Sequence, residues 1–336
     1  MAQDFTFDLP TIWALIIAFA ILLYVMLDGF DLGIGMLFGT TGDEDFRRTM
    51  MGAVAPVWDG NETWLVFVGA NLYAGFPLAY SILLPAFYLP VTLLLVALIL
   101  RGVAFEFRYK TARLRWLWDA SFILGSLVAA FVQGAAVGAI VDGLPIANGR
   151  FVGGAFSWLS PFAVACGVGL VIGYMLIGAG WLVLKTQGPL RDWAYLRLLP
   201  LASALLLFLV LAFGYAATAE LSVMHRWIDR PWLAIFPLIG ALASIGLLIG
   251  VRRRRDWVPF TSIAAIFLAA FGTMAASFWP YMIPFDVTIE QAAAPASSLK
   301  FLVYGAGLFV LPIVLVYTIV VYWVFRGKVR DDVEYH

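Results

Sequence analysis

The sequence has little charge, two histidines and one cysteine, and each scarcity excludes a class of protein. Only 12% of its 336 residues are charged and 63% are hydrophobic, whereas about 25% of an average soluble domain is charged. A water-soluble globule is therefore excluded. Cys166 alone excludes an intrachain disulfide framework and a thiolate metal site. His225 and His336 lie outside every long apolar run, so no such run offers an axial histidine for haem or a pair for copper.

Long apolar runs recur along the chain, and the mean hydropathy is +0.94. A helix needs about 20 apolar residues to cross roughly 30 Å of hydrocarbon. The second run is the least apolar, because Trp58-Asp59-Gly60-Asn61-Glu62 lies near its start, and an eight-span alternative would make that stretch a loop. Nine segments are predicted as spans: 12–38, 52–74, 80–100, 119–141, 161–184, 198–220, 232–250, 258–280 and 301–325.

The distribution of charge predicts the orientation of these spans. The chain carries 21 basic and 21 acidic residues, so no excess of either sign indicates a nucleic-acid partner. With nine spans and the N-terminus outside, 17 of the 21 basic residues lie on the inner side, Arg101 and Arg108 among them. The positive-inside rule then places the C-terminus inside. The sequence predicts an all-α integral membrane protein that forms a single polytopic domain over residues 1–336.

Acidic residues interrupt the first two expected spans. Asp28 and Asp31 lie three residues apart and share one helix face, and Asp59 and Glu62 repeat this spacing. The first span runs inward and the second outward, so all four carboxyls are expected at a similar depth in the cytoplasmic half, next to Asn61. A charge in hydrocarbon costs about 2.5–3.5 kcal/mol on insertion scales, and neighbouring carboxyls disfavour each other's charged form.

Such a cluster is typical of a proton path, and two other interpretations remain open. The polar groups would also suit helix ends that hydrogen-bond across the bundle near the interface. Carboxylates and carbonyls together would suit a hard cation. Gathering four acids at one level favours the proton path over either alternative.

At these motifs the sequence resembles subunit II of the cytochrome bd-type quinol oxidases. The likeness begins at Gly29-Phe30-Asp31-Leu32-Gly33 and Trp58-Asp59-Gly60-Asn61-Glu62-Thr63-Trp64, and continues at Trp279-Pro280-Tyr281-Met282-Ile283-Pro284. Its compact length is similar to the cyanide-insensitive branch. The motif residues outside the expected proton path are Gly29, Gly33, Gly60, Trp64, Arg101, Glu106 and Arg108.

The resemblance implies a fold and partners that composition does not show. The family fold has two four-helix bundles plus one peripheral helix, in a bacterial cytoplasmic (inner) membrane. Subunit II forms a heterodimer with a haem-bearing subunit I, often with a very small third subunit. The haems, b and d or b-type only, and the quinol-oxidising site belong to subunit I. Some members hold a structural quinone in subunit II, alongside membrane lipids.

The resemblance also implies a reaction, the oxidation of quinol with reduction of O2 to water. Its protons come from the cytoplasm, and Asp59 is the best candidate for their path. Asp28, Asp31, Glu62, Asn61 and Trp58 accompany it. This chain itself is expected to hold no catalytic residue, haem or metal.

A different class of function is compatible with the same composition. A proton-coupled secondary transporter would also combine many spans with buried acids. Transporters often carry matching broken helices in two inverted halves, whereas this sequence has one acidic cluster and no second one. A purely structural scaffold would leave the acids without a role.

Overall fold

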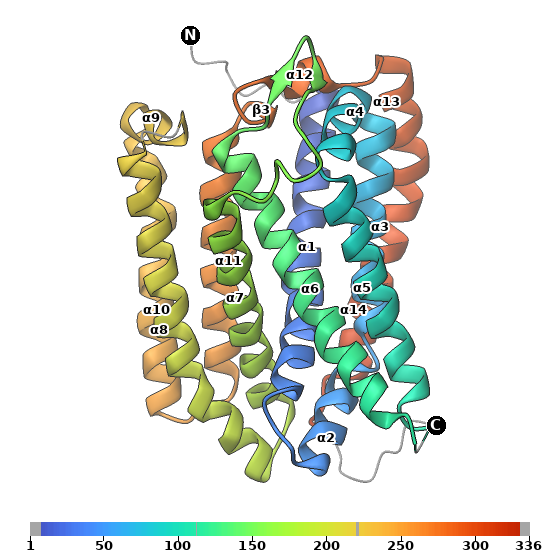
Figure 1. Cartoon of the computed structure of the whole chain (residues 1–336), viewed down its shortest axis with the longest axis vertical. Coiled ribbons are helices and arrows are strands. Elements are labelled where there is room, and N and C mark those ends of the chain that lie inside the picture. The colour runs from blue at the N-terminus through green and yellow to red at the C-terminus, as the bar shows by residue number, and fades with distance from the viewer. Residues whose placement is uncertain (1–7, 112, 220–221, 330–336) are drawn as a thin grey trace.

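A computed structural model describes residues 8–111, 113–219 and 222–329 (Figure 1). Both chain ends, with Arg330 and His336, lie outside the described residues. Long helices run side by side along the longest axis, and the start of the first and the end of the last lie at opposite ends of the bundle. The longer helices are α1 (Leu9–Phe38), α3 (Trp58–Gly75), α5 (Tyr88–Phe107), α6 (Arg115–Asp142), α7 (Pro161–Lys185), α8 (Gly188–Thr218), α10 (Ile235–Arg252), α11 (Trp257–Phe278) and α14 (Leu311–Val324).

Short elements connect these helices at the two ends of the bundle. Two antiparallel hairpins are formed by β1 (Ile146–Ala147) with β2 (Arg150–Phe151), and by β3 (Tyr281–Ile283) with β4 (Val287–Thr288). A π-helical segment, η2, joins α13 to α14. The remaining short helices are α2 (Glu44–Val54), α4 (Pro77–Ala86), α9 (Ser222–Asp229), η1 (Pro231–Ala234), α12 (Ile289–Ala292), α13 (Ala296–Leu302) and η2 (Val303–Val310).

Local sequence explains where the first and seventh helices begin. The Asp8 carboxylate accepts a hydrogen bond from the Thr11 amide at 2.9 Å, and a proline follows in the first turn. Ser160 caps α7 in the same way, again followed by a proline. These caps satisfy backbone N–H groups that a helix start leaves unpaired, and proline suits the first turn because its missing N–H is not needed there.

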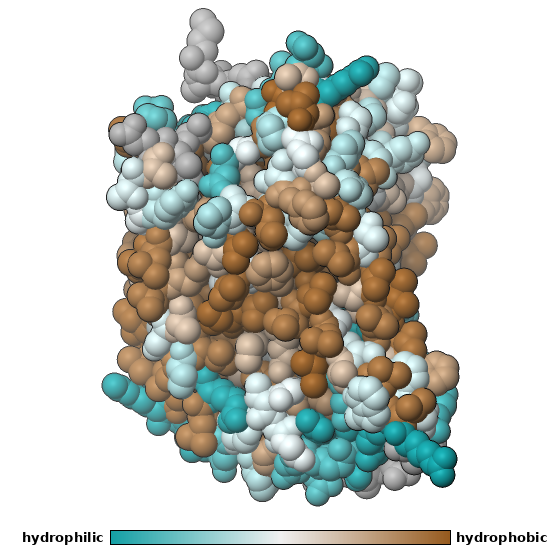
Figure 2. Space-filling model, in the orientation of Figure 1, coloured by the Kyte–Doolittle hydropathy of each residue, from teal (hydrophilic) through white to brown (hydrophobic). Residues whose placement is uncertain are grey.

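Eight helical stretches within the described residues are long and apolar enough to cross a membrane. They comprise α1, α5, α6, α7, α8 and α11, the combined stretch Pro231–Arg252, and the combined stretch Ala296–Val324. The molecular surface shows a brown apolar band between two teal polar ends (Figure 2), as a bilayer requires. The chain is thus a multi-pass membrane protein.

The second and third expected spans differ from the structure. The segment 52–74 begins in α2, turns at 55–57, and continues as the 18-residue α3, which is too polar to count among the eight. The segment 80–100 is shared between α4 and α5, because Phe87 leaves the helical conformation between them (φ −117°, ψ 20°). Helix α5 begins at Tyr88 and continues to Phe107. Arg101 consequently lies inside this helix and not in the inner loop that the charge distribution predicted.

The centre of the bundle is formed by α1, α6 and α7, which approach closely at glycines. A Cβ on Gly33 of α1 would lie 1.8 Å from the Tyr174 carbonyl oxygen of α7. A Cβ on Gly134 of α6 would lie 2.5 Å from the Cys166 carbonyl oxygen of α7. Only glycine allows these backbones so close, which is how small residues drive helix packing in membranes.

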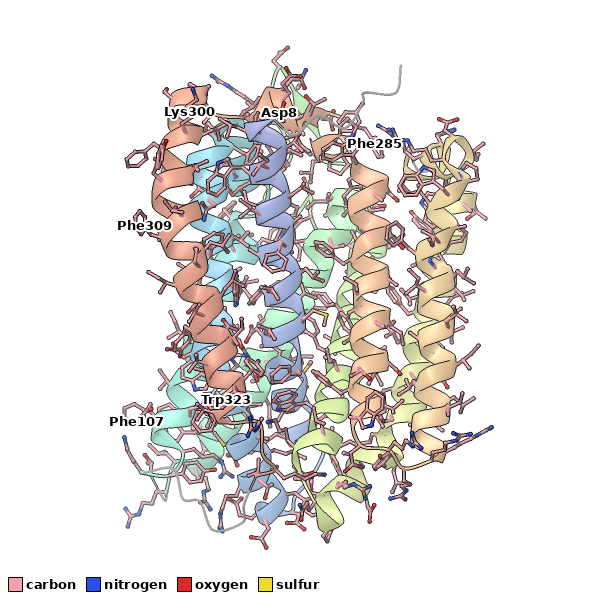
Figure 3. All side chains as sticks on the ribbon, turned by 180° about the vertical axis from the view of Figure 1, so that it is seen from behind. Asp8, Phe107, Phe285, Lys300, Phe309 and Trp323 are labelled. Carbon is pink, nitrogen blue, oxygen red and sulfur yellow. The ribbon has the colours of Figure 1, made fainter. Side chains whose placement is uncertain are left out.

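Helix α14 lies at the edge of the bundle and has no fully buried residue. Figure 3 shows Phe309 and Trp323 projecting away from η2 and α14; Trp323 is 63% exposed. The ammonium group of Lys185 donates hydrogen bonds to the carbonyls of Phe325 and Gly327, at the C-terminal end of α14. A surface helix with few buried contacts is thus fixed at that end by α7.

A second lysine extends this attachment. Lys328 donates to the Thr186 carbonyl at 2.9 Å and to the Asp256 carboxylate at 2.6 Å. Partial burial raises the pKa of Asp256, but hydrogen bonds from Arg191, Lys328 and Tyr195 outweigh it and lower that pKa to about 2. We call the contacts of Lys185, Lys328 and Asp256 the C-terminal clasp.

Candidate functional site

Two buried aspartates of α1 form the centre of the site. Asp28 is fully buried and Asp31 is 1% exposed. Helix α3 packs against α1 and places Asn61, also 1% exposed, and Glu62 beside them. The structure therefore brings together Asp28, Asp31, Asn61 and Glu62, as the spacing of the two motifs predicted.

Arg101 of α5 enters the same cluster. Its Nη2 lies 2.8 Å from Asp28 Oδ1 and also contacts Glu62 Oε1. The Arg101 side chain is fully buried, and that of Glu62 is 22% exposed. The charge distribution had assigned Arg101 to a loop on the inner side, away from the acids. The extension of α5 beyond residue 100 explains the difference, and the available signal was an arginine directly after an apolar run.

Asp31 is held differently from Asp28. Its Oδ2 accepts a hydrogen bond from Asn61 Nδ2 at 2.7 Å, and the same amide nitrogen reaches the Leu27 carbonyl at 3.3 Å. The Tyr322 hydroxyl of α14 donates to Asn61 Oδ1 at 3.0 Å. Asp31 Oδ1 is buried and has no hydrogen-bond partner among the residues that the structure describes. Sequence reasoning missed Tyr322, because 261 residues separate it from Asn61.

A chain of neutral polar groups extends from the cluster toward the middle of the bundle. Tyr24 lies one turn before Asp28 on α1 and interacts with its carboxylate. Gln133 of α6 donates to the Tyr24 hydroxyl at 3.0 Å and accepts from the Tyr174 hydroxyl at 2.8 Å. Sequence reasoning missed these three residues, although Tyr24 and Asp28 have the i, i+4 spacing of one helix face.

Asp59 does not join the buried carboxyls, which corrects the expectation that all four acids form one buried cluster. It is exposed on α3, one turn before Glu62. Asp59 and Glu62 project from α3 in different directions. The Asp59 side chain is therefore exposed, whereas that of Glu62 is largely covered. The indole of the neighbouring Trp58 stacks on Phe105 of α5, with 5.0 Å between ring centroids.

The glycines and the tryptophan of the motifs pack the surrounding helices. A Cβ on Gly29 would lie 2.7 Å from the Tyr174 ring, and one on Gly60 would lie 2.7 Å from the Tyr317 ring. The indole of Trp64 is fully buried beside Tyr24, in a small cluster of apolar side chains. These residues bring α1, α3 and α14 close enough to enclose the acids.

The last two motif residues lie at the C-terminal end of α5. Glu106 is exposed and pairs with Lys110 at 3.2 Å. The buried Arg108 contacts Asp119 at 2.6 Å and Glu44 at 3.0 Å, so it joins α5 to α6 and α2. Partial burial raises the pKa of Glu44, but the contacts with Arg108 outweigh it, and that pKa is lowered overall. These two residues lie outside the buried cluster.

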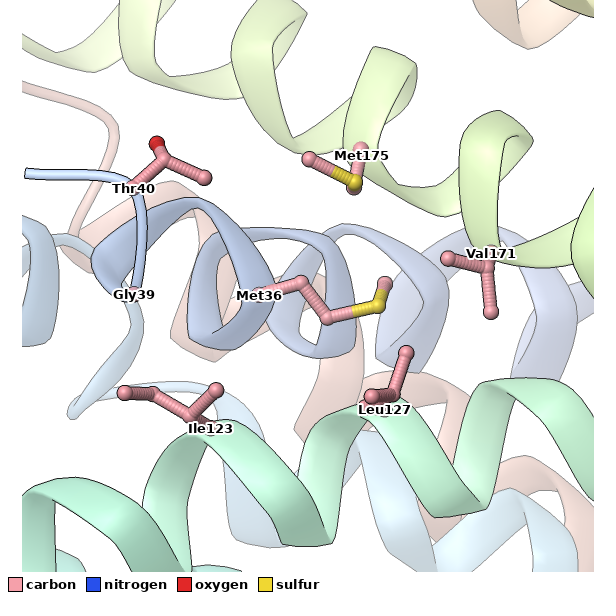
Figure 4. Close-up of a pocket in the computed structure, with 7 residues that line it drawn as sticks. All are labelled: Met36, Gly39, Thr40, Ile123, Leu127, Val171 and Met175. Atoms are coloured by element: carbon pink, nitrogen blue, oxygen red, sulfur yellow. The ribbon is translucent and has the colours of Figure 1, made fainter.

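A shallow crevice of about 290 Å³ opens between α1, α6 and α7 (Figure 4). No charged side chain lines it, and its surface is largely apolar. No group of three or more histidine, cysteine or acidic residues is arranged to bind a metal ion within the described ranges. The lining residues are Met36, Gly39, Thr40, Ile123, Leu127, Val171 and Met175.

Known proteins match this chain along nearly its whole length. The family described as cytochrome bd terminal oxidase subunit II matches residues 9–325. Cytochrome bd-I ubiquinol oxidase subunit 2 of Escherichia coli (strain K12) is 29% identical, with 96% of each chain covered. Cytochrome bd ubiquinol oxidase subunit 2 of Bacillus subtilis (strain 168) is 28% identical, with 96% of this chain and 97% of the relative covered.

Two further comparisons agree. A probable cytochrome oxidase subunit 2 of Haemophilus influenzae is 30% identical over 86% of this chain and 85% of its own length. The solved structure of bd oxidase from Geobacillus thermodenitrificans shares the fold, with a TM-score of 0.75 at 17% identity, covering 95% of this chain and 99% of that one. The family match includes both acidic motifs, and this chain belongs to the cytochrome bd terminal oxidase subunit II family.

Proposed function

We propose that this chain is the haem-free subunit II of an inner-membrane quinol oxidase, and that its buried carboxyl cluster carries protons from the cytoplasm toward O2 reduction. Family membership supports the oxidase complex and a partner subunit I that bears the haems. His225 is exposed on the short helix α9, away from the spans, which supports a haem-free chain. Reducing O2 to water consumes protons, and carboxyl groups in a membrane protein commonly relay them.

The balance of charge in the cluster is the observation that carries this proposal. Asp28, Asp31 and Glu62 lie within one small region, and Arg101 is the only cation that contacts them among the described residues. One arginine compensates one carboxylate. Further negative charges in a low-dielectric interior are opposed by desolvation and by mutual repulsion. The cluster therefore retains protons that it can release and take up again.

The positions of the acids suggest an order along the path. Exposed Asp59 would collect protons at the cytoplasmic side of α3, and Glu62, partly exposed, would receive them one turn deeper. Arg101 connects Glu62 to Asp28, and Asp31 follows on the same face of α1. In this arrangement Asp59 serves at the surface rather than in the interior.

The helix packing supports nine crossings, and the distribution of basic residues supports an N-terminus outside and a C-terminus inside. Helix α3 lies against α1 although its sequence is too polar to count as a span on hydropathy. Consecutive helices pack as pairs, α5 with α6, α7 with α8 and α10 with α11, while α7 also packs on α1 and α6, and α14 lies at the edge. The contacts of α7 with α1 and α6 support one polytopic unit, and its division into two four-helix bundles plus a peripheral helix stays an expectation from the family resemblance.

No observation favours a proton-coupled transporter, since the family match is to an oxidase subunit. A third small subunit and a structural quinone stay expectations from the family resemblance. In the apolar crevice beside Met36, the hydroxyl of Thr40 is the polar side-chain group of the lining, and it already donates to the Leu37 carbonyl.

The proposal is tested by Asp31→Asn in the assembled oxidase. Asparagine keeps the shape and removes the exchangeable proton, so we expect quinol-driven O2 consumption per haem to fall at least ~10-fold, a barrier increase of about 1.4 kcal/mol. Glu106→Gln is the matched control, because Glu106 is an exposed acid near the same end of α5. Normal turnover of Asp31→Asn at full haem occupancy would show that the cluster only packs helices.

A further inference from the structure

Tyr322 is an unexpected participant in the site, because it comes from the helix with the fewest buried contacts. Its ring meets Phe30 and Trp181 edge-on, with centroids 6.5 and 5.9 Å apart. Its hydroxyl donates to Asn61 Oδ1 at 3.0 Å. Helix α14 thereby places one polar atom next to the acids of α1.

This hydrogen bond helps to hold the Asn61 amide in the orientation that faces Asp31. The Tyr322 hydroxyl donates to the amide oxygen, which is the only acceptor of the Asn61 side chain, and the Leu27 carbonyl accepts from the amide nitrogen at 3.3 Å. Together these two contacts keep the amide nitrogen on the side where it donates to Asp31 Oδ2 at 2.7 Å. Asp31 Oδ2 is thereby committed to accepting, and Oδ1 is the atom left to carry a proton.

We propose that Tyr322 is a positioning residue, which holds the Asn61 amide so that Asp31 binds and releases its proton at Oδ1. This inference rests on the proposed proton path. The charged groups that surround Asp31 within the described residues are Asp28 on its own helix, Glu62 from α3 and Arg101 from α5. Helix α7 contributes the uncharged ring of Trp181 here, and the indole N–H of that residue donates to the Ala53 carbonyl.

The C-terminal clasp fixes the register of this tyrosine. Lys185 binds the Phe325 carbonyl, only three residues beyond Tyr322. Because α14 has no fully buried side chain, this attachment and the Tyr322 hydrogen bond together define the height of the helix against α3.

Tyr322→Phe removes one oxygen atom and keeps the ring, so the oxidase is expected to assemble. Without the hydroxyl, the amide can rotate and present its oxygen to protonated Asp31, which stabilises the protonated form. Proton release then needs a higher pH. We expect the alkaline limb of the pH profile of quinol-driven O2 consumption to move up by about half a unit or more. Tyr304→Phe is the control, since Tyr304 is 67% exposed and lies on η2, in the same helical stretch as Tyr322.

Infrared difference spectroscopy separates this inference from the proposed function. The C=O stretch of protonated Asp31 is the band that disappears in Asp31→Asn. In Tyr322→Phe this band should shift, and in Tyr304→Phe it should not. A shifted band with an unchanged pH profile would support the positioning role and count against the proton path. An unshifted band in Tyr322→Phe would overturn the inference.

Discussion

Arg101 lies on α5, and Arg108 follows seven residues later as the residue that ends this helix. Both side chains are fully buried, yet their surroundings differ. Arg108 uses three nitrogens, Nε toward Asp119 and both Nη atoms toward Glu44. Arg101 bonds through Nη2 alone, and its Nε and Nη1 have no hydrogen-bond partner in the described part of the chain. The guanidinium of Arg108 thus has a hydrogen-bond acceptor at each of its three nitrogens, whereas that of Arg101 lacks one at two of them.

The two arginines also differ in how much positive charge accompanies the acids around them. Glu44 and Asp119 are 36% and 13% exposed, and Arg47 and Arg115 supply further positive charge. The three acids near Arg101, which are the buried Asp28 and Asp31 and the partly exposed Glu62, outnumber it. A network in which every acid contacts an arginine rigidifies the adjoining ends of α2, α5 and α6. An acid-rich network in the interior is costly unless protons neutralise it, which suits transport rather than anchoring.

Of the substitutions considered, Arg101→Leu should reduce O2 consumption per haem the most. It leaves Asp28 without its cation, and breaking a buried pair costs about 3–5 kcal/mol. We expect O2 consumption per haem to fall ~100-fold or more, equivalent to about 2.7 kcal/mol, with less assembled oxidase.

The double variant Arg101→Leu with Asp28→Asn removes both charges of the pair and provides the control. It should recover assembly, measured as haem content of the purified complex, while turnover stays low. Equal activity of the double variant and the wild type would refute a role for this pair in proton transfer.

Arg108→Leu should give a smaller and purely structural effect. The hydrogen bonds to Asp119 and Glu44 are lost, but other arginines and water still reach these acids. We expect about 1.5–3 kcal/mol of lost stability, seen as a lower melting temperature of the solubilised complex, with unchanged turnover per haem. A fall in turnover as large as that of Arg101→Leu would remove the distinction between the two arginines.

The Arg108 network should also weaken in acid. The pKa of Glu44 is lowered in the folded protein, so its contribution is present above the ordinary glutamate value of about 4.3. That contribution is lost as the pH falls through the lowered pKa. The difference in melting temperature between wild type and Arg108→Leu should therefore narrow below about pH 4.3.

Asp59→Asn should have the smallest effect of the three, and its size should depend on pH. An exposed carboxylate assists proton uptake most when protons in solution are scarce, and water can replace it in part. We expect O2 consumption per haem to fall about 3-fold at alkaline pH, or about 0.7 kcal/mol, and little at acidic pH. A loss of 10-fold or more at every pH would place Asp59 within the buried path after all.

Much of the site was predictable from residue spacing. Asp28 with Asp31, and Asn61 with Glu62, lie within single helices of opposite direction, so their shared depth follows from helix geometry. Asp59 was placed wrongly because a three-residue spacing sets proximity along a helix, while exposure depends on which neighbours cover each side. Arg101 was misplaced because hydropathy gives the extent of the apolar run, whereas α5 continues beyond it.

The sequence by itself determined a multi-pass helical membrane protein with acids in its first two long apolar segments, because hydrocarbon requires long apolar helices and makes buried charge exceptional. Only the tertiary structure decided which groups neutralise and orient those acids. Arg101 lies 73 residues from Asp28, and Tyr322 lies 261 residues from Asn61. Contacts at such separations depend on helix packing, which close glycine approaches and the C-terminal clasp establish and which no local pattern encodes.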